Sequence, residues 1–264
     1  MDIFKHLKDN KDALIAEKKF KVKQADAVVL VDNLTIDNAL VNKAENNTDL
    51  LSKDELNIKV VINTTNILDS HGDVHIKGIW NKSVKEQKNL YLLQEHKMTF
   101  DKIISDKLTA SIKNTTFKEL GFTDLKGETQ ALLFDVNINA KRNPFMFEQY
   151  AKGYVKEHSV GMRYVNLLLC INSEEKYYAE EKTNWDKYIS EVSNKEDAIA
   201  NGYFWAVTEA KIVEGSAVVK GSNYATPTLS VKNIEAVDNT SKTEPSKDTQ
   251  INNNKQFFIN QLKN

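Results

Sequence analysis

The stretch KEHSVGMRYVNLLLCI, from Lys156 to Ile171, decides the fold prediction. Its valines, leucines and isoleucine, with little turn chemistry between them, predict a long β-strand. Ser159 and Gly161 stand near its beginning, where a strand needs neither residue. A frayed strand end is the ordinary explanation. A nucleophile beside a freed backbone amide is the functional one.

The residues on both sides of this stretch predict more strands. Alternating or β-branched runs occur at 57–67, 90–96, 101–117, 130–138 and 203–221. The pair Asn143-Pro144 predicts the start of a helix just before the opening stretch. The short connections favour antiparallel pairing. We therefore expect an α+β fold, a mostly antiparallel closed or half-closed β-barrel with flanking helices.

The remaining segments predict appendages to this barrel. Residues 1–50 are expected to be an N-terminal helical appendage and linker, with helical spacing over the first half and a short strand at 27–33. Residues 51–234 would be the barrel domain, carrying a charged helical insertion at about 173–202. Residues 235–264 are polar and are expected to be a disordered tail that ends in a small amphipathic patch.

Composition narrows the class of protein. The 264 residues carry a formal net charge of -1, so the composition lacks the basic excess that would predict a nucleic-acid partner. No apolar run approaches the roughly 18 residues of a membrane span, and the charged N-terminus lacks a signal-peptide core. We expect a soluble, intracellular protein without an internal disulfide. Its one cysteine, Cys170, lies in an apolar run and is expected to be a packed core thiol.

A serine nucleophile needs a base, and the chain has five histidines. His158 is adjacent to Ser159, but neighbouring side chains on a strand point to opposite faces, so His158 cannot easily reach the Ser159 hydroxyl. His96 ends an apolar strand, where its ring could be held by the core while its edge faces a cleft. It is the candidate base, with a buried structural role as the alternative. The other three histidines lie in the appendage or in a turn-rich stretch: His6, His71 and His75.

The turn-rich segment DSHGDVH offers a competing metal site. It clusters Asp69, His71, Asp73 and His75, and such side chains can bind zinc or magnesium. Its spacing matches no established ligand signature, so we expect no metal. A metal-dependent hydrolase built on this cluster stays open as an alternative.

Four segments in order resemble the head-maturation (prohead) proteases of tailed phages, which share a fold with the herpesvirus assemblins. They are DSHGDVHIKGIWNKSV, LYLLQEH, EHSVGMRYV and VTEAKIVEGSAVVKGSNYATP, spread over roughly residues 55–230. The family's Asp-x-x-Gly-Asp segment and Gly-aromatic turn match Asp69, Gly72, Asp73, Gly78 and Trp80. Its Thr-Glu-x-x-Leu-x-Glu-x-Ser-x-Val strand matches Thr208, Glu209, Ile212, Glu214, Ser216 and Val218. Met162 replaces the usual aromatic residue, the final turn lacks its first proline, and the 173–202 insertion is long.

The resemblance implies roles for individual residues. Ser159, in the Ser-(Ile/Val)-Gly motif, would be the nucleophile and His96 the base. Glu214 is our candidate to orient the His96 ring by accepting a hydrogen bond, as in triads on unrelated folds. Glu209 is the reserve. Five residues separate the two glutamates, so in a regular strand only one of them can face the site.

The backbone amides near the start of the strand that carries Ser159 would form the oxyanion hole. There Gly161 would let the chain turn its amides inward. The oxyanion hole would comprise Gly161, Met162 and Arg163, with the arginine holding the oxyanion region as the resemblance implies. A surface salt bridge is the ordinary alternative for Arg163.

The resemblance also implies a function. The protein would be a serine endopeptidase, active without a cofactor, that cleaves scaffold and major capsid protein, and then itself, inside the immature capsid in the host cytoplasm. No membrane or nucleic-acid partner is expected, and a homodimer or an assembly inside the prohead is a hypothesis taken from the assemblins. The alternative is a catalytically inactive capsid-assembly or scaffold protein with the same fold.

Overall fold

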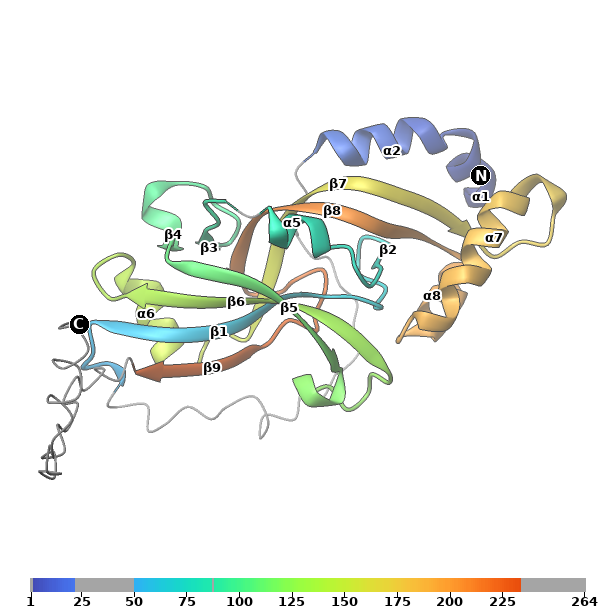
Figure 1. Ribbon diagram of the computed structural model, residues 1–264. Coiled ribbons are helices and arrows are strands. Elements are labelled where there is room, and N and C mark those ends of the chain that lie inside the picture. The colour runs from blue at the N-terminus through green and yellow to red at the C-terminus, as the bar shows by residue number, and fades with distance from the viewer. Residues whose placement is uncertain (1, 22–49, 87, 234–264) are drawn as a thin grey trace, which may run out of the picture. The chain divides into compact units, whose positions relative to one another are not determined.

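A computed structural model describes residues 2–21, 50–86 and 88–233 of the chain. These residues form an α+β fold with two β-sheets and several short helices (Figure 1). The predicted strand at 27–33 and the predicted tail at 235–264 lie outside the described residues.

The first sheet is four-stranded and antiparallel, in the order β5-β6-β1-β9. Its strands are β5 (Leu108–Thr116), β6 (Glu128–Asn139), β1 (Glu55–Thr64) and β9 (Thr228–Asn233). In β6 one run of apolar residues is almost wholly buried, as expected for a strand inside a sheet. The sheet packs its inner face on the main hydrophobic core through residues such as Val60, Phe134 and Val231.

The second sheet has β8 (Tyr203–Val218) at its centre. One edge of β8 pairs antiparallel along its length with β7 (Glu157–Ile171). Its other edge pairs in parallel with two short strands, β2 (Asp73–His75) and β3 (Leu92–Gln94), and β3 pairs antiparallel with β4 (Ile103–Ser105). The stretch from Lys156 to Ile171 is therefore a strand from Glu157 onward, as predicted.

The expected closed or half-closed barrel is wrong, because neither sheet of the described residues closes on itself. Periodicity identified most strands, but closure depends on which edges pair, and that is decided by tertiary packing. Pairing is also less uniformly antiparallel than expected, since β2 and β3 run parallel to β8. The long β7-β8 ribbon reaches beyond the first sheet and is covered by helices at its far end (Figure 1).

The helices are short and lie at the ends and faces of the sheets. The segment 173–202 is helical as predicted. Its Trp185 and Tyr188 pack with Phe204 and Cys170 in a second hydrophobic cluster. The helices are α1 (Ile3–Asp9), α2 (Lys11–Phe20), α5 (Asn81–Lys85), α6 (Pro144–Ala151), α7 (Ala179–Tyr188) and α8 (Lys195–Asn201), with 3-10 turns η1 (Phe100–Lys102), η2 (Lys118–Leu120), η3 (Lys176–Tyr178) and η4 (Ile189–Glu191). As expected from Asn143-Pro144, the Asn143 side chain caps α6 by accepting from the Met146 N–H.

The N-terminal helices α1 and α2 are docked on the sheet rather than separate from it. Leu7 is buried in the main core, and Lys8 and Lys11 both donate to the Glu181 carboxylate, at 2.6 and 3.0 Å. Glu181 is fully buried, and burial without two such partners would strongly disfavour its charge. These ion pairs join the beginning of the chain to α7.

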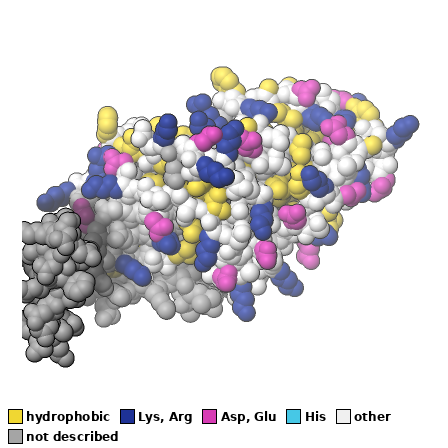
Figure 2. Space-filling model, in the orientation of Figure 1, with side chains coloured by type: hydrophobic (Ala, Val, Ile, Leu, Met, Phe, Trp, Pro, Cys, Tyr) yellow, Lys and Arg dark blue, Asp and Glu magenta, His cyan; other side chains and the backbone are white. Residues whose placement is uncertain are grey.

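The surface shows mixed charge. Lysine and acidic side chains lie interspersed over the face drawn in Figure 2, with small apolar areas between them. Many of them are paired at the surface, as Lys182 is with Asp186 at 2.8 Å. None of the described helices is both long and apolar enough to cross a membrane.

His158 ties the start of β7 to the core. Its Nδ1 lies 3.0 Å from the Thr226 carbonyl oxygen, which can only accept, so Nδ1 carries the proton and Nε2 accepts from the Tyr150 hydroxyl at 3.0 Å. The side chain is fully buried, and this burial lowers the pKa of His158 to about 4. His158 therefore faces away from Ser159, as strand alternation predicted.

This buried histidine predicts a pH-dependent stability. The unfolded chain takes up a proton at His158 near pH 6.5, whereas the folded chain does so only near pH 4, so stability falls as pH drops through this window. We expect this residue to cost about 2 kcal/mol of unfolding free energy between pH 7 and pH 5. Urea unfolding at both pH values would measure it. His158→Gln should remove this share of the pH dependence, and equal losses in both proteins would contradict the assignment.

Candidate active site

The register of β7 against β8 brings the predicted site residues together. Ser159 lies directly opposite Ser216, and Gly161 directly opposite Glu214. Directly opposed residues of an antiparallel pair share a face of the sheet. The alternate residues Val160 and Met162 are in the main core, so Ser159 and Gly161 face the other side.

His96 reaches this face from β3. Its Nδ1 lies 2.6 Å from Glu214 Oε1, and both residues are buried, at 8% and 2% exposed. The predicted hydrogen bond between the ring and the glutamate is therefore present in the structure. Because the carboxylate accepts this bond, Nδ1 carries the proton and Nε2 becomes the basic nitrogen.

The turn that carries His96 has a strained backbone. Glu95 and His96 both have positive φ, at 52° and 56°, a conformation that costs about 1–2 kcal/mol for a residue with a side chain. The Glu95 N–H donates to the Ala217 carbonyl at 2.9 Å and the His96 N–H to Ser216 Oγ at 3.1 Å. These bonds to β8 hold the turn and aim the imidazole at Glu214. Such outliers cluster at functional sites.

Strand register places Ser159 beside this pair. It lies across the ladder from Ser216, whose hydroxyl contacts both Glu214 and the His96 backbone. A hydrogen bond between nucleophile and base is often long before substrate binds. The arrangement is compatible with proton transfer from Ser159 to His96, and the catalytic roles stay predictions.

The structure requires a glycine at position 161 for a different reason than the one expected. A Cβ at this position would lie 1.9 Å from Glu214 Oε1 and 2.7 Å from its Cδ. The glycine is therefore required because the Glu214 side chain crosses over it on the way to His96. Gly161 itself sits in the paired ladder opposite Glu214, so the structure does not show the inward turn expected for an oxyanion hole.

The other two expected oxyanion residues lie on opposite faces of β7. Met162 is fully buried in the main core, so only its main chain is available to a substrate. Arg163 is exposed and is paired in register with Lys211. Their expected oxyanion roles stay predictions.

A bulge in β8 removes the expected alternation between the two glutamates, and their positions along the strand decide between them. Gly161 pairs with Glu214 and Met162 with Ile212, so Val213 is an extra residue on β8. The parity argument that set Glu209 against Glu214 assumed a regular strand and is therefore wrong. Glu209 is separated from the site because it lies further along β8, partly exposed, where it binds Lys82 Nζ at 3.3 Å. Glu214 alone of the two contacts His96.

Ser216 received no role from the sequence. Its hydroxyl donates to Glu214 Oε2 at 2.6 Å, and the side chain is fully buried. The signal was available in the spacing, since residues two apart on a strand share a face and Glu-x-Ser therefore places both side chains together.

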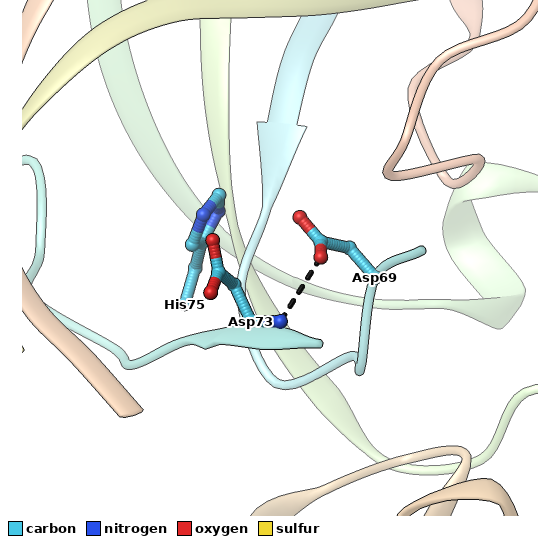
Figure 3. A group of neighbouring side chains, drawn as sticks. All are labelled: Asp69, Asp73 and His75. Atoms are coloured by element: carbon cyan, nitrogen blue, oxygen red, sulfur yellow. Dashed lines mark hydrogen bonds between the residues drawn. The ribbon is translucent and has the colours of Figure 1, made fainter. Parts of the chain in front are cut away.

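The acidic and histidine cluster of the turn-rich segment lies apart from His96. One ligand atom each from Asp69, Asp73 and His75 lie within 4.8 Å of one another, and His71 is not part of this group (Figure 3). Asp69 Oδ1 accepts from the Asp73 N–H at 3.0 Å and from the His71 N–H at 2.8 Å. This carboxylate therefore closes the turn before β2.

The Asp73 carboxylate is engaged on both oxygens. Lys18 Nζ of α2 lies 2.8 Å from Oδ1, and the Tyr164 hydroxyl donates to Oδ2. His75 Nδ1 lies 3.0 Å from Asn63 Oδ1. A metal ion here would have to displace the lysine ammonium, so the geometry favours a structural role in holding α2 on the sheet. Stoichiometric zinc retained by purified protein would revive the metal-dependent hydrolase.

Cys170 is buried in the cluster beneath α7 and α8. Burial raises the pKa of its thiol to about 12, so the reactive thiolate is disfavoured at neutral pH. This environment supports the expected core role.

Comparison with protein-family models, with curated proteins and with solved structures found no match to this chain. The geometry of the site and the motifs in the sequence are therefore the observations that bear on function.

The crossing of Glu214 over Gly161 predicts the effect of a single methyl group. We expect Gly161→Ala to push the carboxylate away from His96, because the new Cβ would overlap Oε1. The hydrogen-bonded Nδ1 proton of His96 should disappear from its downfield position in proton NMR spectra, with a loss of stability of about 1–3 kcal/mol from overpacking. Ser230→Ala, on the distant strand β9, is a matched control. An unchanged His96 signal in Gly161→Ala would contradict the steric role.

The pairing of Lys18 with Asp73 predicts a stability difference between Lys18, inside α2, and Lys21, which directly follows the helix. Lys18→Ala leaves a fully buried carboxylate without its ammonium, so we expect the free energy of unfolding to fall by about 2–3 kcal/mol. Lys21→Ala removes only an exposed pair with Glu17 and should change stability little. Urea unfolding of the two variants would test this, and equal effects would argue against the buried pair.

Proposed function

We propose that this protein is a serine endopeptidase of the phage prohead type. One observation carries the proposal. Buried Glu214 accepts a hydrogen bond from His96 Nδ1 on the face of β7 and β8 to which Ser159 belongs. The three side chains come from the turn after β3, from β7 and from β8, in the order of the family motifs, which supports the same proposal.

In this mechanism the Ser159 hydroxyl attacks the carbonyl carbon of the scissile peptide. His96 Nε2 takes the hydroxyl proton as the C–O bond forms, and Glu214 stabilises the resulting imidazolium through Nδ1–H. The imidazolium then donates its proton to the leaving amine as the C–N bond breaks. Water, deprotonated by the same histidine, attacks the acyl-enzyme and releases Ser159.

The strained turn and the buried carboxylate support catalysis over a purely structural site. Two consecutive left-handed residues and a desolvated glutamate are costly features that do not improve packing. They are understandable where a histidine must be held in one orientation. The alternative is a catalytically inactive capsid-assembly or scaffold protein, and the comparison of wild type with Ser159→Ala distinguishes it from a peptidase.

The substrates follow from the resemblance and are part of the proposal. They are scaffold and major capsid protein inside the immature capsid, in the host cytoplasm, followed by the protease itself. Main-chain donors near Gly161 and the exposed Arg163 are the proposed oxyanion contacts. A homodimer or a larger assembly inside the prohead is part of the same hypothesis.

The test compares the full-length protein with Ser159→Ala. We expect a fluorophosphonate probe to label wild type at Ser159, and mass spectrometry to show self-cleavage over time. Ser159→Ala should stay intact and unlabelled, and His96→Ala should lose activity by a factor on the order of 10⁴ or more. Glu209→Gln is the matched control and should retain full activity. Intact, unlabelled wild type that co-assembles with capsid protein would favour the inactive alternative.

A further inference from the structure

The Ser216 side chain joins the two halves of the candidate active site. Its hydroxyl lies 2.6 Å from Glu214 Oε2 and 3.1 Å from the His96 backbone nitrogen. It is fully buried and directly opposes Ser159 across the ladder. Ser216 belongs to the Glu-x-Ser part of the sequence motif, which by itself gives it no role.

The directions of these two hydrogen bonds are fixed by chemistry. The His96 N–H can only donate, so Ser216 Oγ accepts from it. The single hydroxyl proton of Ser216 is then directed to the Glu214 carboxylate, which accepts. Glu214 is consequently held on both oxygens, by the His96 ring at Oε1 and by Ser216 at Oε2.

A carboxylate held at both oxygens cannot rotate about its terminal bond. One bond alone would leave the Glu214 carboxylate free to rotate and turn Oε1 away from the imidazole. The second bond of Ser216 fixes the left-handed backbone at His96, from which the ring projects. One hydroxyl therefore orients both the base and its carboxylate partner.

We propose that Ser216 is a positioning residue for the His96–Glu214 pair, acting through both groups without touching the substrate. The inference rests on the proposed peptidase function. It extends that function by adding a fourth side chain whose removal lowers the rate of the chemical step rather than substrate binding.

The fold does not depend on Ser216 alone, so its removal should affect the orientation of His96 and Glu214 more than the folding of the protein. The turn is also held by the bond from Glu95 N–H to the Ala217 carbonyl, and β3 stays paired with β8. Removing one hydroxyl therefore leaves the fold with other support. The expected loss is in the orientation of two side chains.

The kinetic experiment uses Ser216→Ala and Ser216→Thr in the full-length protein with a peptide substrate. We expect Ser216→Ala to lower kcat roughly 10- to 100-fold, which is the effect of losing one charge-assisted hydrogen bond, with KM changed less than about twofold. Ser216→Thr keeps the hydroxyl and should recover most of the rate. Ser230→Ala is the matched serine control and should behave as wild type.

A second readout does not need activity. In the Ser159→Ala background, the Nδ1 proton of His96 should give a downfield NMR signal, and adding Ser216→Ala should shift it upfield or abolish it. Circular dichroism and thermal unfolding check that each variant folds. If Ser216→Ala does not fold, Ser216→Cys, which keeps the volume but donates weakly, replaces it in both experiments.

The outcomes separate this inference from the proposed function. A His96 signal that depends on Ser216 in a protein without peptidase activity would support the positioning role and overturn the peptidase. Full activity and an unchanged signal in Ser216→Ala would overturn the positioning role and leave the peptidase intact. A raised KM with unchanged kcat would also overturn it, because Ser216 would then act on substrate binding.

Discussion

The antiparallel pairing of β7 with β8 is the constraint on which the rest of the structure depends. Its register sets Ser159 against Ser216 and Gly161 against Glu214, while the alternate residues fill the core. The same strand β8 also carries the parallel strand β3 that delivers His96. A shift of one residue would move every one of these side chains to the wrong face.

Buried charges recur in this fold, and each is satisfied by a partner from a distant part of the chain. Glu214 is held by His96 and Ser216, Asp73 by Lys18 and Tyr164, and Glu181 by two lysines of α1 and α2. Desolvation makes such groups poor sources of net stability, but leaving one unpaired is strongly unfavourable. They therefore select one arrangement of the N-terminal helices, the sheet and the site.

The sequence predicted local features well and tertiary features less well. Apolar alternation identified β1, β6, β7 and β8, and the spacing of motifs led to the pair His96 and Glu214. The barrel was wrong because strand patterns do not say which sheet edges meet. The short elements β2, α5 and β9 were missed because three to six residues carry little periodicity. The reason for Gly161 was invisible because it lies in a cross-strand neighbour, Glu214, rather than in the local chain.

The extra residue Val213 has a further consequence for how this chain can vary in length. Ile212 and Glu214 are two residues apart and would share one face of a regular strand. The bulge lets Ile212 face the core while Glu214 faces the site. Deletion of Val213 would remove the bulge and make Ile212 and Glu214 direct neighbours, which face opposite sides of a regular strand, so both would keep their environments. A one-residue insertion or deletion between Glu214 and Ser216, by contrast, would put these two side chains on opposite faces. The helical segment at 173–202 follows the far end of the β7-β8 ribbon, at the pair Ile171 and Tyr203, so a change in its length would leave the site in place.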